Sequence, residues 1–138
     1  MTTSDKPVYG QEDASFKAAG GEAGIQKLVE DFYRIMDERA HAEVIRKMHP
    51  HDLEVSVDKL ARFLCGWLGG PRLYNEKYGS ISIPAVHAHL VIHESERDAW
   101  LNCMQEAIAL QHYAADFAVY LLTQLRVPAE RIFQTSKK

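Results

Sequence analysis

Apolar residues recur at intervals of three and four along most of the chain, and this spacing predicts helices with one buried face. After a glycine pair at 20–21, the first such face carries Ile25, Leu28, Val29, Phe32 and Met36. A second face begins after Asp52 and carries Leu53, Val57, Leu60, Leu64 and Leu68. The Gly-Gly-Pro run at 69–71 is typical of a helix end, so the pattern predicts two long helices in the first half of the chain.

Two more long helices are predicted in the second half. Ser95 is a suitable N-cap, with Asp98 in the first turn, where negative charge suits the helix dipole. The apolar face of this third helix carries Trp100, Met104, Ile108 and Gln111. The last helix is expected over about residues 112–125, and its face carries Phe117, Tyr120, Leu121 and Leu125. Pro128 is expected to end it, because proline does not fit a helix interior.

Shorter segments join these helices. Residues 13–18 predict a short helical turn, and residues 41–48 predict a corner that is closed by a proline. The stretch 71–84 has no clean period and is predicted as a connection that Tyr74 and Tyr78 partly order. No segment alternates with period two, so the fold class is predicted to be all-α.

The length of 138 residues with 46% hydrophobic residues fits one domain with its own core. We expect three parts: a loose N-terminal leader with a short helix (1–19), the domain itself (20–133) and a polar tail (134–138).

Charge and cysteine content narrow the function classes. A net charge of −3 and a pI of about 6.1 argue against a nucleic-acid partner or an anionic membrane surface and favour a small-molecule partner. No apolar run of membrane-spanning length occurs and the N-terminus lacks the layout of a signal peptide, so we expect a cytoplasmic protein. Cys65 and Cys103 lie within apolar patterns, which predicts buried reduced thiols.

The chain has seven histidines. Three are expected at the surface: His41, His51 and His112. His87 and His89 are two residues apart and do not share a helix face, and no HExxH motif occurs, so a zinc site is disfavoured. A haem iron needs only one axial imidazole. Spacing alone leaves His87 open between an iron ligand and a structural or surface residue, and it leaves His49, His89 and His93 ambiguous as well.

The run from His87 through Ser95-Glu-Arg-Asp-Ala-Trp100-Leu-Asn-Cys-Met104 resembles the proximal-histidine segment of group II truncated haemoglobins. The glycine pair at 20–21 with Phe32-Tyr33, and the segment 67–72, resemble that family in the same order and at fitting separations. The resemblance covers roughly residues 15–127. It implies a globin-like, two-over-two helical sandwich that encloses haem b, with His87 as the metal ligand.

The resemblance also implies roles for other residues. It gives three ligand-stabilising side chains on the distal side: Tyr33, His49 and Trp100. It gives a distal pocket wall of Phe32, Ser56, Leu60 and Phe63. Candidate contacts with the cofactor are Lys59, Arg72, Tyr74 and Met104. Without the resemblance, Tyr33 and Trp100 would be interpreted as core aromatics.

Two departures from the family pattern lie beside His87. Many relatives carry Arg immediately before the proximal histidine, where it can pair with a haem propionate, whereas this chain has Val86. The candidates for propionate anchoring are then Lys59, Arg72, Tyr74 and Lys77, each of which could equally be a solvated surface residue. His89-Leu90 stands where relatives often have Pro-Phe, which alters packing without touching the ligand.

The implied function is reversible binding of O2, or O2 transport, by a haem iron, with NO, CO or peroxide as further small ligands. NO dioxygenation or peroxidase-type turnover is left open, and no enzyme activity is assigned. Turnover of NO needs electrons, and the chain has no flavin or nicotinamide motif, so a separate reductase would be the partner. The alternative is a non-haem helical regulatory or interaction module, which predicts a colourless protein.

Overall fold

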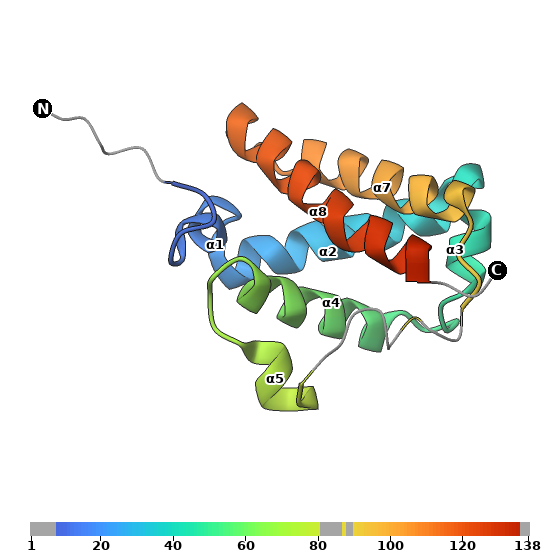
Figure 1. Ribbon diagram of the computed structural model, residues 1–138, viewed down its shortest axis with the longest axis horizontal. Helices are drawn as coiled ribbons and strands as arrows, with labels where there is room; N and C mark the ends of the chain where they lie inside the picture. The colour runs from blue at the N-terminus through green and yellow to red at the C-terminus, as the bar shows by residue number, and fades with distance from the viewer. Residues whose placement is uncertain (1–7, 81–86, 88–89, 136–138) are drawn as a thin grey trace, which may run out of the picture.

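The computed structural model describes residues 8–80, 87 and 90–135, and every regular element in these ranges is helical (Figure 1). The elements are α1 (Ala14–Ala18), α2 (Gly21–Glu38), the 3-10 turn η1 (Ala40–Ala42), α3 (Glu43–Lys47), α4 (Glu54–Trp67), α5 (Leu73–Tyr78), α7 (Glu94–Ala109) and α8 (Ala115–Thr135). The predicted all-α class is confirmed. None of the described helices is long and apolar enough to cross a membrane.

The four long helices form two packed pairs. α2 contacts both α4 and α7, and α7 also packs against α8. In Figure 1, α7 and α8 lie side by side above α4, and α2 runs behind them. The pairs α2/α4 and α7/α8 therefore make a two-over-two arrangement, as the sequence predicts.

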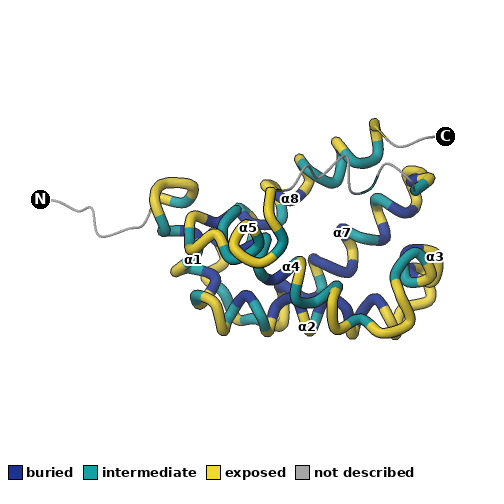
Figure 2. The backbone as a smooth tube through the Cα atoms, turned by 90° about the horizontal axis from the view of Figure 1, so that it is seen from below, coloured by how far each residue is buried: buried dark blue, intermediate teal, exposed yellow. Residues whose placement is uncertain are grey.

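The amphipathic faces predicted from the sequence meet in the core. In Figure 2, buried stretches alternate with exposed ones along α2 and α7, as expected for helices that turn one face inward. The largest fully buried side chains include Phe32, Ile25, Leu28 and Met36 from α2, Leu64 from α4, Met104 from α7, and Phe117 and Leu121 from α8. Both cysteines are buried and reduced, as predicted.

The glycine pair after α4, Gly69 and Gly70, is required because the segment around α1 passes close to the backbone there. Gly69 has φ +94°, and a Cβ there would overlap the backbone oxygen of Glu12. A Cβ on Gly70 would overlap the ring of Phe16, whose N–H donates to the carbonyl of Leu68 at 3.0 Å. The predicted stop signal thus also lets the segment around α1 pack against the end of α4.

Two predicted helix starts are wrong. α7 begins at Glu94 with His93 as its N-cap, because the carboxylate of Glu96 reaches back and accepts the backbone N–H of His93 at 2.9 Å. Ser95 therefore lies in the first turn, where its hydroxyl donates to Glu96. His112 has φ +59° and lies in the turn before α8 instead of at its start, although it is exposed as expected.

The predicted end of α8 at Pro128 is also wrong, since the helix continues to Thr135. Proline removes one helical hydrogen bond, so the later turns need other support. Arg97 of α7 supplies it: its Nη1 donates to Glu130 Oε1 at 2.7 Å, and its guanidinium lies 4.8 Å from the ring centroid of Phe133. Tertiary contacts thus override a local stop signal.

The connection after α4 contains the short helix α5. Its two tyrosine rings, Tyr74 and Tyr78, lie 5.0 Å apart, in agreement with the prediction that they order this stretch. Asp58 of α4 accepts hydrogen bonds from Lys77 Nζ at 2.8 Å, from the Tyr78 hydroxyl and from Arg62 Nε at 2.8 Å. This shared carboxylate fixes α5 against α4.

Candidate functional site

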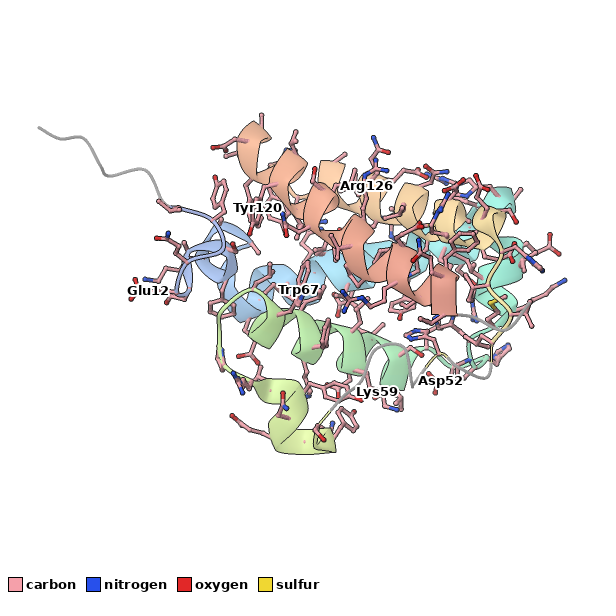
Figure 3. All side chains as sticks on the ribbon, viewed as in Figure 1. Glu12, Asp52, Lys59, Trp67, Tyr120 and Arg126 are labelled. Carbon is pink, nitrogen blue, oxygen red and sulfur yellow. The ribbon has the colours of Figure 1, made fainter. Side chains whose placement is uncertain are left out.

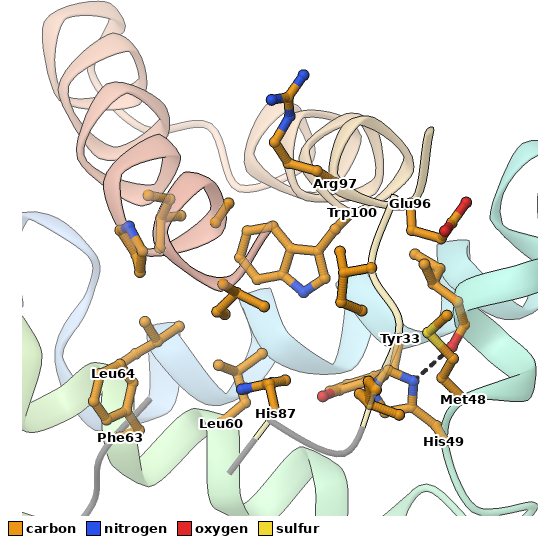
Figure 4. A pocket seen from close by; sticks show the side chains of 17 residues that line it. Tyr33, Met48, His49, Leu60, Phe63, Leu64, His87, Glu96, Arg97 and Trp100 are labelled. Carbon is orange, nitrogen blue, oxygen red and sulfur yellow. Dashed lines mark hydrogen bonds between the residues drawn. The ribbon is translucent and has the colours of Figure 1, made fainter. Parts of the chain in front are cut away.

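A cavity of about 290 Å³ lies where α2, α4, α7 and α8 meet α3, the corner after α3 and the residues His87, Leu90 and Ile92 (Figure 4). Most of its walls are apolar, as is usual for a small-molecule site. The lining residues are Tyr33, Ile45, Met48, His49, Leu60, Phe63, Leu64, His87, Leu90, Ile92, Glu96, Arg97, Trp100, Leu125, Pro128, Ala129 and Ile132.

His87 lines this cavity from the segment before α7. Its backbone carbonyl accepts the N–H of Leu90 at 3.0 Å, which closes a local turn, and Figure 4 shows the imidazole pointing into the cavity. Within residues 8–80, 87 and 90–135, no three His, Cys, Asp or Glu side chains are gathered around a common point for a metal ion. His87 can therefore offer one imidazole to a metal that has its other ligands from elsewhere.

Tyr33 reaches the cavity from α2. Its side chain is 7% exposed, and burial raises the pKa of its phenol above the ordinary value, so the hydroxyl keeps its proton. The ring packs edge-on against Phe32, with ring centroids 4.9 Å apart, and against His49, with ring centroids 5.5 Å apart. No group in the described part of the chain accepts a hydrogen bond from this hydroxyl.

Trp100 faces the same cavity from α7. Its ring is half-buried and packs edge-on against Phe32, with centroids 5.2 Å apart. In Figure 4 the indole nitrogen points into the cavity, and among the residues that the structure describes it has no acceptor. A buried polar group without a partner destabilises a fold by about 1–3 kcal/mol. The buried hydroxyl of Tyr33, with the half-buried indole N–H of Trp100 at the same cavity, therefore calls for an explanation.

His49 enters the cavity from the corner after α3. Its Nδ1 lies 2.8 Å from the backbone oxygen of Ile45. Burial lowers the pKa of His49, against the opposing effect of that hydrogen bond. The four polar side chains predicted from the family resemblance, at positions 33, 49, 87 and 100, thus line one cavity.

The predicted apolar wall is brought together only in part. Leu60 and Phe63 line the cavity from α4. Phe32 does not line it and instead packs behind the rings of Tyr33 and Trp100. Ser56 is half-buried on α4 and is not among the lining residues.

The four predicted cofactor contacts do not line the cavity. Lys59 is exposed at the outer edge of α4 (Figure 3), with its Nζ 5.4 Å from the ring centroid of Tyr78. Arg72 is exposed at the start of α5. Tyr74 packs edge-on against Phe63 with centroids 6.5 Å apart, and Met104 is fully buried in the core. Val86 and His89 lie outside the described residues.

Sequence reasoning missed the wall formed by α8. Pro128, Ala129 and Ile132 line the cavity from turns that were expected to lie beyond the helix. It also missed Glu96 and Arg97, which line the cavity beside Trp100. Their adjacency to Trp100 at the start of one helix was the available signal.

Comparisons with known proteins agree on one family. A family model described as bacterial-like globin matches residues 14–129. Group 2 truncated hemoglobin YjbI of Bacillus subtilis (strain 168) is 30% identical over 120 residues, which make up 87% of this chain and 88% of that protein. These matches cover the helices that build the cavity.

Two solved structures show the same fold. The group II 2-on-2 haemoglobin from the plant pathogen Agrobacterium tumefaciens matches with a TM-score of 0.84 and 30% identity, over 99% of this chain and 100% of that one. The truncated oxygen-avid haemoglobin from Bacillus subtilis matches with a TM-score of 0.78 and 29% identity, over 86% of this chain and 97% of that one. The resemblance inferred from the sequence is confirmed, and the chain belongs to the bacterial-like globin family as a group II truncated haemoglobin of the 2-on-2 type.

Proposed function

We propose that this chain binds haem b in the cavity through His87, and that Tyr33 and Trp100 hold O2 there by hydrogen bonds. Membership of the haemoglobin family implies haem-based binding of small ligands. The observation that carries the finer proposal is the pair of donors without partners, which face one cavity together with the imidazole of His87. A ligand that accepts hydrogen bonds would satisfy both donors.

The residues present fit a haem. The walls are largely apolar, which suits a porphyrin, and one imidazole points inward. When bound, the haem supplies an iron that takes up O2, NO, CO or peroxide. Arg97 is a positively charged residue of the described lining, but its guanidinium points away from the cavity in Figure 4. Hydrogen bonds to Asp98 and Glu130 hold it there.

The protein's own contribution is orientation and exclusion of water. Apolar side chains from α4 and α8 keep the ligand space dry, which strengthens hydrogen bonds within it. Tyr33 stays protonated, and the indole of Trp100 can only donate, so both act as fixed donors. Each such bond is worth about 0.5–1.5 kcal/mol, so the two together slow ligand escape by about one to two decades.

Binding of O2 is favoured over turnover as the main activity. One structural relative is described as oxygen-avid, and two donors suit the partial negative charge of bound oxygen. NO dioxygenation or peroxide reduction at the same site would require electrons from a separate reductase, since the chain carries no flavin or nicotinamide motif. We place the protein in the cytoplasm, with small ligands as its partners and neither nucleic acid nor membrane.

A visible spectrum of the purified protein tests the proposal. We expect a Soret band that is lost or weakened in His87→Gly and restored by added imidazole, because free imidazole can replace the missing side chain. The matched control His51→Ala removes an exposed histidine and should leave the band unchanged. A colourless protein that ignores added haem would instead support the non-haem helical module.

A further inference from the structure

The wall that α8 adds to the cavity changes character at Pro128. The turns before it are anchored in the core by buried side chains, which are Phe117, Leu121 and Leu125. In the turns after it, none of the described residues 129–135 is buried, although Ala129 and Ile132 line the cavity. Figure 2 shows the difference, because no buried stretch follows in the last turns of α8. These turns cover the cavity without being packed into the core.

Pro128 also interrupts the hydrogen bonds of the helix at this boundary. Proline has no backbone N–H, so the carbonyl oxygen of Gln124 loses the donor that a continuous helix would supply. Helices bend most readily at such a point, and a segment with few buried contacts opens locally at a low free energy. The other described helices that line the cavity, α2, α3, α4 and α7, each contribute buried side chains to the core. The last turns of α8 are therefore the weakest wall among the described helices.

Arg97 of α7 holds these turns from the outer side of the wall. Its guanidinium points away from the cavity in Figure 4, and its Nη1 donates to Glu130 Oε1 at 2.7 Å. The same guanidinium lies 4.8 Å from the ring centroid of Phe133. One side chain thus contacts two residues of α8 that lie one turn apart, both beyond the proline.

Both partners of this ion pair are held in place by their own helices. Asp98 accepts hydrogen bonds from Nε of Arg97 at 3.1 Å and from Nη2 at 3.0 Å, which leaves Nη1 for Glu130. Glu94 lies 3.5 Å from Nη2. On α8, Oε2 of Glu130 accepts a hydrogen bond from Gln134 Nε2 at 2.8 Å. The side chain of Arg97 is 19% exposed and that of Glu130 is 43% exposed, so the pair is partly shielded and salt can still screen it.

We propose that residues 129–135 of α8 form a flap over the cavity, with Pro128 as its hinge and the ion pair of Arg97 and Glu130 as its latch, and that a haem-sized ligand enters and leaves through this flap. A porphyrin is wide and flat, and it cannot pass between helices that are closely packed through buried side chains. It needs a wall that opens. Arg97 is then a positioning residue that keeps the flap closed. The passage of haem rests on the proposed function, whereas the opening of the flap does not.

The rate of haem loss from the full chain tests the latch. The haem-loaded ferric protein is mixed with an excess of haem-free myoglobin, and the visible spectrum follows the transfer. Glu130→Gln should lose haem about 2- to 5-fold faster, as expected for the loss of one partly exposed ion pair. Arg97→Met should lose it about 3- to 10-fold faster, because the contact with the ring of Phe133 is lost as well. The exposed Arg126→Met, on the same helix, is the control and should leave the rate unchanged.

Salt distinguishes a latch from general support of the fold. Haem loss from the native chain should become faster between about 0.05 M and about 0.5 M salt, because screening weakens the ion pair. Arg97→Met has no such pair to weaken, so its rate should depend less on salt. Equal salt dependence in the two chains would refute the latch.

The hinge is tested by a variant with the opposite expected sign. Pro128→Ala restores an N–H donor to the carbonyl of Gln124, so the flap should open less often. Haem loss and hydrogen exchange in residues 129–135 should each become at least about 3-fold slower. In the native chain, the same residues should exchange at least about 10-fold faster than those around Leu121. Equal exchange in the two parts of α8 would mean that they open together, which would contradict the flap.

The outcomes separate this inference from the proposed function. An unchanged rate of haem loss in Arg97→Met, or a faster one in Pro128→Ala, would overturn the passage of haem through the flap while haem binding through His87 stands. A chain that takes up no haem would refute the proposed function and the passage of haem with it. Hydrogen exchange of the haem-free chain would then still decide whether the flap opens.

Discussion

Removing the Tyr33 hydroxyl should stabilise the folded haem-free protein while weakening its hold on O2. The group is buried at 7% exposure and has no acceptor in the described part of the chain, so Tyr33→Phe removes a desolvated donor without breaking a bond. Removal of this unpartnered hydroxyl should raise the free energy of unfolding by about 1 kcal/mol. This is the low end of the usual range, because water in the cavity can partly satisfy the group. Urea unfolding of the haem-free protein measures the gain.

Tyr113 provides a matched control. It is also a largely buried tyrosine, and burial raises its pKa to about 12, but its hydroxyl donates to the backbone oxygen of Ala19 at 3.4 Å. Tyr113→Phe breaks that contact and should lower the unfolding free energy by up to about 1 kcal/mol. The two variants remove the same hydroxyl group. Changes of opposite sign in the free energy of unfolding would therefore reflect the presence or absence of a hydrogen-bond partner.

The second half of the prediction concerns the haem-loaded protein. Tyr33→Phe should raise the O2 dissociation rate about 2- to 12-fold, the loss of one neutral hydrogen bond, whereas Tyr113→Phe should leave it unchanged. Stopped-flow displacement of O2 by CO measures the rate. A loss of stability in Tyr33→Phe, or an unchanged O2 rate, would refute the idea that this hydroxyl is kept unsatisfied for a ligand.

Three further predictions concern the scaffold. Arg97→Met should increase hydrogen exchange in the turns of α8 after Pro128 about 3- to 10-fold, because Arg97 links those turns to α7 through Glu130 and Phe133. The exposed Arg126→Met should not. The hydrogen bond from Lys77 is the main reason why the pKa of the Asp58 carboxylate lies well below its usual range. The ionised Asp58 therefore stabilises the fold above about pH 4, and this stabilisation is lost as the pH falls further. Asp58→Asn should therefore show less acid destabilisation in urea titrations from pH 6 to pH 3 than the native chain. Gly69→Ala should lower the unfolding free energy by about 1–3 kcal/mol, measured in the same way, because φ there is +94° and the backbone of the segment before α1 blocks a Cβ.

The long helices could be predicted because burial imposes the period of three to four residues on their sequences. α5 could not, since six residues carry too few apolar positions to define a period. The start of α7 was placed at Ser95 by its residue type, but the competing contact from Glu96 to the N–H of His93 decides the boundary. Helix ends depend on single contacts, and these are hard to rank from sequence.

The side chains of the site came from the family resemblance and not from local pattern. Tyr33, His49, His87 and Trp100 lie on four separate segments, and only the packing of α2 against α4 and α7 brings them to one cavity. From the local sequence pattern alone, each of them could also be a core aromatic or a surface histidine without a functional role. The order and separation of several motifs carried the prediction, because a shared fold fixes which segments meet.

The position of Lys59 shows why a residue that is adjacent in sequence to a lining residue need not line the cavity itself. Leu60 lines the cavity, and one residue along a helix turns the side chain by about 100°, so Lys59 points to the side of the face that Leu60 presents and is exposed. The neighbours on the face of Leu60 are three or four residues distant: Phe63 and Leu64 do line the cavity, whereas Ser56 lies one turn too early.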